Sequence, residues 1–286
     1  MTVTELAALD DEGLRTFLDP ADAGVDPQLL GRALQDAPAR MAKRVIDALP
    51  ETTRQVAGDA WVATTGADSR RDAWHETLAV LFWPLLYWNH PLEYLELIEG
   101  EAIEPALLQQ LPLDGAVVCD IGAGAGRFTL HAAARAARVV AVDAVPPLLA
   151  ILQQRLQRMQ LHNVDIRRGA FAALPIDDAS VDLAVACSAF MTGGPHGGDA
   201  ALREAERITR PGGSVAVVWP QDAAWFEERG YERIAVSGDA VRHFATPEAA
   251  LRLCERFYGD DAAQWVRSNR TADVPYAVLG LSLIHI

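Results

Sequence analysis

The sequence predicts an α/β protein in which a mostly parallel, doubly wound sheet follows a block of helices. Two short apolar runs, Ala116 to Cys119 and Val139 to Val142, each end in an acid, and they frame a glycine-rich turn and an Ala-rich helical stretch. This order of strand, turn, helix and strand is typical of half of a nucleotide-binding sheet. The short, β-branched runs downstream are typical of strands that helices cover on both faces.

The glycine turn is the first candidate site. Three alternate glycines, Gly122, Gly124 and Gly126, follow Asp120. Glycine adopts positive φ and lets a ligand approach where a Cβ would clash, and free N–H groups at a helix start can hold an anionic group. Because ligands of parallel sheets bind beyond the carboxyl ends of the strands, we expect a nucleotide here. Asp143, which ends the second strand, can accept from both ribose hydroxyls, and Asp120 would face a cationic or amine group.

The turn differs from the two common phosphate-binding motifs. A dinucleotide site needs G-x-G-x-x-G, but Arg127 occupies the position of the third glycine. The Gly-Lys-Ser/Thr of a Walker loop is absent from the sequence. An acid followed by G-x-G-x-G resembles motif I of the class I S-adenosylmethionine-dependent methyltransferases. This resemblance implies that the glycine turn packs against the methionine portion of the cofactor and that Asp143 binds its ribose.

Further stretches resemble the same family in the expected order. Leu174-Pro175, Asp178-Ala179-Ser180 and Asp182-Leu183 match the turn before the fourth strand, and Arg203 to Pro220 resembles the helix, R-P-G-G turn and fifth strand. The resemblance covers Ala116 to about Pro220 and implies a Rossmann-like, doubly wound, seven-stranded, mostly parallel sheet. It implies that the following residues bind the cofactor: Asp120, Gly122, Ala123, Gly124, Asp143, Ala144, Ala170, Phe171 and Cys187.

One of these positions departs from the family pattern. After the glycine that ends the third strand, the family often has an acid that accepts from the exocyclic amine of adenine. This chain has Ala170 there, which removes that hydrogen bond. The next residue, Phe171, either covers the adenine face or belongs to the hydrophobic core. The missing acid affects how tightly the cofactor binds more than which cofactor we expect to bind.

The chain divides into three parts. Residues 1–110 form a helical extension with amphipathic helices expected at Thr4–Leu18, Asp26–Leu34 and Ala37–Leu49. Residues 111–280 form the expected S-adenosylmethionine-binding domain. Residues 281–286, LSLIHI, resemble the conceptual translation of a sequencing-adapter end, so we interpret them as an artefactual tail that replaces the natural C-terminus.

An aromatic block within the extension has two interpretations. Most of the stretch from Ala73 to Gly100 fits a hydrophobic core beneath the sheet. Tyr87, Trp88, His90 and Tyr94 combine apolar bodies with polar tips, so the alternative is a helical lid over a small-substrate pocket. Methyltransferases that resemble this chain commonly carry such a lid before their first strand.

The remaining elements are expected from periodicity and from turn residues. A glycine-rich loop, Met191 to Asp199, should lie over the site. The expected helices and strands are a helix from Pro146, strands Val164–Arg168 and Val181–Cys187, a helix Asp222–Arg229, a strand Tyr231–Val236, helices Pro247–Phe257 and Asp261–Arg267, and a last strand starting at Val274–Leu279.

Composition excludes several classes of partner. The net charge of −14 disfavours nucleic acids, which need a basic face on the protein. No apolar run is long enough to cross a membrane, and the N-terminus lacks the pattern of a secretory signal. The three cysteines are scattered, which favours free thiols in a reducing compartment and offers no metal-ligand spacing. We therefore expect a cytoplasmic protein that acts on a small molecule, with no metal. The oligomeric state does not follow from the sequence.

Methyl transfer from a sulfonium is an in-line displacement that requires no particular catalytic side chain. Positioning alone can supply about 7–11 kcal/mol of barrier reduction. A general base is needed only for a poorly acidic hydroxyl or a carbon acid, and His196 and His90 are the candidates. Two alternatives stay open: a methyltransferase-like module that binds cofactor without turnover, and an NAD-type oxidoreductase, against which Arg127 and the R-P-G-G turn argue.

Overall fold

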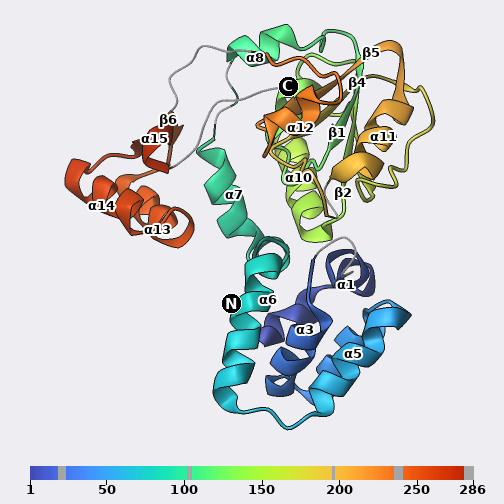
Figure 1. Ribbon diagram of the computed structural model, residues 1–286. Helices are drawn as coiled ribbons and strands as arrows, with labels where there is room; N and C mark the ends of the chain where they lie inside the picture. The colour runs from blue at the N-terminus through green and yellow to red at the C-terminus, as the bar shows by residue number, and fades with distance from the viewer. Residues whose placement is uncertain (19–23, 102, 104, 195–196, 235–240, 280–286) are drawn as a thin grey trace.

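The computed structural model describes residues 1–18, 24–101, 103, 105–194, 197–234 and 241–279 of the 286-residue chain. The sheet and the helices that cover it lie at the top of Figure 1, the N-terminal helices lie below them, and a C-terminal unit lies to the left. The predicted tail, residues 281–286, is outside the described residues.

Five parallel strands form the central sheet, in the order β3-β2-β1-β4-β5. They are β1 Val117–Ile121, β2 Arg138–Asp143, β3 Val164–Arg168, β4 Val181–Cys187 and β5 Thr209–Val218. The chain winds outward from β1 to β3 and then crosses to β4 on the other side of β1. The gap between β1 and β4 is therefore the switch point, where open α/β sheets bind their ligands.

Helices cover both faces of the sheet, as predicted. These helices are α8 Pro105–Gln110, α9 Arg127–Ala133, α10 Pro146–Met159, α11 Gly198–Ile208 and α12 Ala223–Glu227. Successive strand residues point to opposite faces, so Val118 packs with α8 and α9 while its neighbour Cys119 packs with α11 and α12. Ala141 packs against α10. The doubly wound, Rossmann-like α/β architecture is confirmed.

The seven-stranded sheet is not confirmed in the described residues. β6 Val241–His243 and β7 Asp273–Pro275 form a separate, antiparallel two-stranded sheet. The predicted strand Val274–Leu279 is wrong beyond Pro275, because Tyr276–Leu279 form helix α15. Proline has no N–H for a strand ladder and suits the start of a helix, so the chain changes from strand to helix there. Of the predicted strand Tyr231–Val236, residues 231–234 lie in no strand and the rest is outside the described residues.

The N-terminal block is helical, as predicted, but is divided more finely. Its elements are 3-10 helices Val3–Ala8 and Leu34–Asp36 and α-helices α1 Asp11–Leu18, α3 Pro27–Ala33, α4 Ala39–Ala48, α5 Glu51–Val62, α6 Ala67–Asn89 and α7 Pro91–Glu99. The single helix expected over Thr4–Leu18 is interrupted at Asp10, whose carboxylate accepts from the Gly13 N–H at 2.7 Å. This cap starts a new helix because it satisfies a donor that has no partner within the helix.

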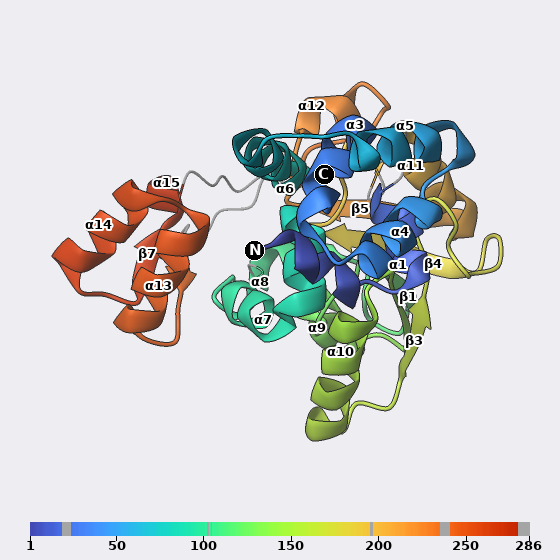
Figure 2. The same ribbon diagram turned by 90° about the horizontal axis from the view of Figure 1, so that it is seen from below.

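The C-terminal unit packs against α7. It contains α13 Pro247–Phe257, α14 Asp260–Asn269, α15 and the β6–β7 pair, and it stands at one side of the molecule in both views (Figures 1 and 2). Leu97 of α7 belongs to its hydrophobic core. Arg256 Nε lies 2.7 Å from Glu93 Oε1, and the His243 N–H donates to the Gly100 carbonyl at 2.9 Å. Helix α7 therefore joins this unit to the rest of the chain.

A buried cluster of charges, which we call the Glu101 clasp, connects three parts of the fold. The Glu101 carboxylate, just after α7, forms ion pairs with Arg127 at the start of α9 and with Arg242 of β6. The Arg242 side chain is only 1% exposed. Because two guanidinium groups share one buried carboxylate, the clasp keeps a positive charge inside the protein that Glu101 only partly balances.

The clasp predicts a large loss of stability when its carboxylate is removed. Glu101→Gln leaves two buried guanidinium groups without a counter-charge, which should lower the free energy of unfolding by about 3–5 kcal/mol. Urea unfolding at neutral pH measures this loss. The matched control is Glu99→Gln, since Glu99 is an exposed partner of Arg155 and should cost no more than about 1 kcal/mol. Equal losses of stability in Glu101→Gln and Glu99→Gln would contradict the assignment of the clasp as a buried cluster of ion pairs.

Candidate functional site

A cavity of about 860 Å³ opens at the carboxyl ends of the strands. It is bounded by the glycine turn, α6, α7, the segment after β4 and the end of α13. Of the residues predicted to bind the cofactor, these line the cavity: Gly122, Gly124, Asp143, Ala144, Phe171 and Cys187. Asp120, Ala123 and Ala170 are not among its described lining residues.

The glycine turn needs its glycines for both backbone geometry and space. Gly122, Gly124 and Gly126 have φ of 73°, 52° and 93°, the left-handed region that side chains with a Cβ disfavour. A Cβ on Gly122 would lie 2.7 Å from both Ala189 Cβ and Phe171 Cζ. The turn therefore brings bare backbone to the cavity wall.

Asp143 joins the end of β2 to the glycine turn. Its Oδ2 accepts from the Gly124 N–H and its Oδ1 from the Val145 N–H, both at 2.8 Å. Burial raises the pKa of this carboxyl to about 6, and the backbone donors oppose that rise. Each carboxylate oxygen has further lone pairs, so the group can still accept hydrogen bonds from a ligand.

Asp120 is buried behind the turn and faces α9. Its Oδ2 accepts from the Thr129 hydroxyl, while its Oδ1 is buried without a hydrogen-bond partner among the described residues. Burial raises the pKa of this carboxyl to about 7, and the nearby charge of Asp143 adds to the rise. The predicted contact between Asp120 and a ligand amine stays a prediction, because the group does not line the cavity.

Phe171 belongs to the hydrophobic core and also lines the cavity, and its contact with an adenine stays a prediction. It is buried in the core under the sheet, and its ring meets Phe190 edge-to-face at a centroid distance of 5.9 Å. It also lines the cavity. Ala170, beside it, forms an isolated bridge with Ala173. One ring therefore fills the core and presents part of its surface to the site.

The aromatic block is divided between core and cavity. Tyr87 and Tyr94 line the cavity, with ring centroids 4.8 Å apart, and burial raises the pKa of both hydroxyls. Trp88 belongs to the core of the N-terminal block and packs on Phe17. The lid interpretation therefore fits the two tyrosines and not Trp88.

Of the two candidate bases, His90 is among the described residues and does not line the cavity. His90 Nε2 lies 3.8 Å from Glu5 Oε2 and is not among the described lining residues, which include no histidine. His196 lies outside the described residues. A general base therefore stays a prediction for His196, and His90 is not in position for that role.

Several lining residues were missed by sequence reasoning. Glu101 and Arg127 of the clasp line the cavity, and the Arg127 guanidinium lies 5.0 Å from the ring centroid of Trp219. Burial raises the pKa of the Glu101 carboxyl to about 8, whereas the two guanidinium groups that contact it favour the charged form. The sequence marked Arg127 only as a departure from the dinucleotide motif.

Two residues at adjacent strand ends carry backbone strain. Ser188 follows β4 and Trp219 follows β5, with φ of 54° and 53°, and both line the cavity. Left-handed conformations of residues other than glycine are uncommon and concentrate at ligand sites. This strain agrees with the placement of the site at the switch point, and no local sequence signal predicted it.

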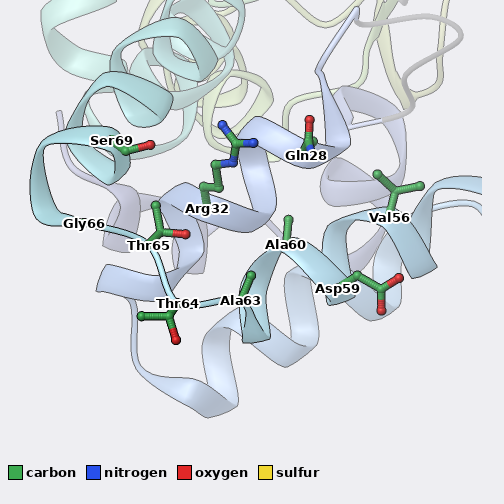
Figure 3. Close-up of a pocket in the computed structure, with 10 residues that line it drawn as sticks. All are labelled: Gln28, Arg32, Val56, Asp59, Ala60, Ala63, Thr64, Thr65, Gly66 and Ser69. Carbon is green, nitrogen blue, oxygen red and sulfur yellow. The ribbon is translucent and has the colours of Figure 1, made fainter.

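A second hollow, of about 690 Å³, lies in the N-terminal block (Figure 3). Polar side chains of α3, α5 and the turn before α6 line it, including Arg32, Asp59 and Thr65. It shares no described lining residue with the cavity at the strand ends. None of the predicted site residues is found there.

The described residues contain no group of three or more His, Cys, Asp and Glu side chains that could hold a metal ion. Among the same residues, no helix is both long enough and apolar enough to cross a membrane.

Residues 118–213 match the family model of a methyltransferase domain. An uncharacterized methyltransferase of Mycobacterium tuberculosis is 34% identical over 139 residues, which cover 48% of this chain and 54% of that protein. An uncharacterized methyltransferase-like protein of Schizosaccharomyces pombe is 32% identical over 104 residues, which cover 36% of this chain and 38% of that protein. The matched part of the chain thus spans about half the length of the Mycobacterium tuberculosis relative and less than half the length of the Schizosaccharomyces pombe relative.

Solved methyltransferases also resemble the chain. Phosphoethanolamine N-methyltransferase 1 of Haemonchus contortus, in complex with phosphoethanolamine and S-adenosylhomocysteine, is 26% identical, with a TM-score of 0.38 over 54% of this chain and 33% of that one. A SAM-dependent methyltransferase of Aquifex aeolicus is 17% identical, with a TM-score of 0.38 over 50% of this chain and 90% of that one.

The family match falls on the strands and the glycine turn that carried the sequence resemblance. Residues 118–213 are therefore similar to a methyltransferase domain, and the methyltransferase resemblance of the sequence is confirmed for this part of the chain.

The glycine turn predicts different costs for two alanine substitutions. Gly115→Ala places a Cβ at φ 72° in open space. Its free energy of unfolding should therefore fall only by the cost of a left-handed backbone, about 1–2 kcal/mol. Gly122→Ala has nearly the same φ, and its Cβ also meets Ala189 and Phe171, which should add about 1–3 kcal/mol of overpacking. Urea unfolding of both variants checks the difference. If Gly122→Ala cost no more than Gly115→Ala, the close packing of the turn would be wrong.

Asp120 predicts a pH-dependent loss of stability. Its folded pKa of about 7 lies above the ordinary 3.8, so the folded state holds a proton that the unfolded chain releases between these values. Its contribution to stability therefore falls as the pH rises from about 4 to about 7 and stays low above that. Asp120→Asn does not titrate, so its stability should improve relative to the unmodified protein between pH 5 and pH 8. Urea unfolding at pH 5 and at pH 8 measures the free energy of unfolding of both proteins. A difference between them that is the same at both pH values would contradict the raised pKa of Asp120.

Proposed function

We propose that this protein is an S-adenosylmethionine-dependent methyltransferase that transfers a methyl group to a small-molecule acceptor by in-line displacement. The observation that supports it best is the buried Asp143 carboxylate bound to the Gly124 N–H beside a cavity, within a methyltransferase domain. The acceptor, the cofactor and the mechanism are parts of this proposal.

The residues at the glycine turn fit the proposed cofactor. A Cβ on Gly122 would fill the space against the turn, so bare backbone is available to the methionine portion. Asp143 is available to the ribose hydroxyls, and Phe171 and Ala144 offer apolar surface to the adenine. When bound, the cofactor would supply a methyl group on a sulfonium, which is already an activated leaving group.

The rest of the cavity would orient the acceptor and exclude water. The side chains of Tyr87 and Tyr94 are partly buried and line the cavity. A water-poor cavity favours the loss of sulfonium charge that accompanies transfer. Holding the two reactants at near-attack distance is the main catalytic contribution that these groups can make. The described lining residues include no histidine, and no general base is required when the acceptor atom is a good nucleophile.

Two cysteines support a cytoplasmic location, which is also part of the proposal. Cys119 and Cys254 are buried and form no disulfide bond among the described residues. Unpaired cysteines suit a reducing compartment.

The two alternatives make different predictions about ligands. The silent module either holds the cofactor without turnover or has lost the cofactor through Ala170, which stands where the family often has an adenine-binding acid. The NAD-type oxidoreductase is disfavoured by the match of residues 118–213 to a methyltransferase domain and by Arg127 at the third glycine position.

Calorimetric titration separates these functions. We expect one S-adenosylhomocysteine bound per chain and no heat with NADH. Asp143→Asn should weaken S-adenosylhomocysteine about 10- to 100-fold, the effect of losing hydrogen bonds to a charged group. Asp114→Asn is the control, because Asp114 pairs with Arg135 on the surface and does not line the cavity.

Transfer of a labelled methyl group from S-adenosylmethionine to a small-molecule metabolite fraction then separates an enzyme from a binding module. Heat with NADH and none with S-adenosylhomocysteine would overturn the proposal. Binding without any labelled product would favour the silent module.

A further inference from the structure

We infer that the methyl acceptor is an uncharged, mainly apolar molecule with a flat aromatic or polyunsaturated body, which lies along an aromatic wall formed by α6 and α13. This inference rests on the proposed function, since it identifies the class of substrate for the same cavity. Four observations support it: the origin of the wall, its charge, the orientation of its rings and the exposure of its rim.

The outer part of the cavity is built from segments outside the methyltransferase domain match. Trp83 and Tyr87 come from α6, and Phe257 and Tyr258 come from the end of α13. The family match covers residues 118–213 only. The proposed cofactor residues lie within that span, so the aromatic wall belongs to the part of the cavity that remains for the acceptor.

The wall offers no free charge to an acceptor. The charged residues among the described lining residues are Glu101, Arg127 and Asp143. Glu101 and Arg127 contact each other in the clasp, and Asp143 binds backbone N–H groups beside the proposed ribose position. Arg242, the other guanidinium of the clasp, is only 1% exposed and does not line the cavity. An anionic acceptor would therefore lose its hydration and meet no positive charge except that of Arg127, which Glu101 already contacts, and this is costly. The net charge of −14 adds a long-range repulsion against anions.

The rings of the wall form a continuous apolar surface. The Trp83 and Phe257 rings are stacked, with an interplanar angle of 12° and centroids 6.0 Å apart. The Trp83 and Tyr87 rings are tilted by 31° at 6.1 Å, and Tyr87 meets Tyr94 edge-to-face deeper in the cavity. Aromatic side chains favour offset or edge contacts with other flat π systems. A planar body can therefore lie along this surface with its reacting atom near the tyrosines.

Apolar side chains also line the rim of the cavity. Val80, Trp83 and Met191 are 39%, 44% and 39% exposed, and all three line the cavity. Exposed apolar surface beside a cavity is typical of a binding site for an apolar ligand. The rim therefore extends the aromatic wall toward solvent, so the body of the acceptor can reach the protein surface.

Two fluorescent probes that share one ring skeleton test the inference on the full chain with saturating S-adenosylhomocysteine. N-phenyl-1-naphthylamine is uncharged, and 8-anilinonaphthalene-1-sulfonate adds an anionic group. We expect the uncharged probe to bind at one saturable site, and the anionic probe to bind at least about tenfold more weakly because its charge has no partner.

Variants at the rim locate that binding site. Trp83→Ala removes the outer ring, and Val80→Asp places a charge at the rim; each should weaken the uncharged probe by about fivefold or more. The matched control is Val62→Asp, because Val62 is 75% exposed on α5 and does not line the cavity. This control should leave the affinity of the probe unchanged. Thermal unfolding of each variant, measured in parallel, checks that the chain remains folded.

The inference would be overturned if the anionic probe bound as tightly as the uncharged probe or more tightly. It would also be overturned if Trp83→Ala and Val80→Asp both bound the uncharged probe as tightly as the unmodified protein does. The inference and the proposed function fail separately. Heat with S-adenosylhomocysteine together with a reversed order of the probes overturns only the class of acceptor. Absence of that heat overturns the proposed function and, with it, the assignment of the apolar ligand as a methyl acceptor.

Discussion

The hydrogen bond from the Gly124 N–H to the Asp143 carboxylate is the interaction on which the candidate site depends. It joins the end of β2 to the glycine turn after β1, and the second carboxylate oxygen fixes the start of α10 through the Val145 N–H. One side chain thus positions three elements around the switch point of the sheet. Burial makes this arrangement costly unless the carboxylate is hydrogen-bonded, so the site gains rigidity from the same contacts that stabilise its charge.

The parts of the fold that local sequence patterns determine were predicted well. The strands Val164–Arg168 and Val181–Cys187 and the helix Pro247–Phe257 have the predicted bounds, because short apolar runs and a proline at the helix start are local signals. The last predicted strand failed at Pro275, where a missing N–H outweighed the apolar pattern. The Asp10 cap divides the N-terminal helix that the apolar periodicity predicts as one, because an aspartate before a helix can accept from the first free N–H groups.

The candidate site could be predicted only in part, for a similar reason. The glycines and Asp143 are close in sequence and follow two adjacent strands, so parallel pairing brings them together. Glu101, Arg127 and Arg242 meet from three distant segments, and no local pattern indicates such a contact. His90 has a suitable side chain for a base, but it lies near Glu5 and does not line the cavity.

The cavity combines a part that lies within the methyltransferase domain match with a part that lies outside it. The glycine turn and Asp143 lie in the methyltransferase domain, whereas the aromatic wall comes from α6 and α13, which the Glu101 clasp and α7 connect to that domain. Function in such folds depends on the site that is built onto a common scaffold. Here the clasp couples the position of that wall to Arg127, directly after the glycine turn.

A crystal structure of the complex with S-adenosylhomocysteine tests the central claim most directly. The account predicts both ribose hydroxyls within hydrogen-bonding distance of the Asp143 carboxylate, the methionine portion along the glycine turn, and the sulfur facing the part of the cavity that Tyr87 and Tyr94 line. A nucleoside bound elsewhere, or one whose ribose does not contact Asp143, would contradict it.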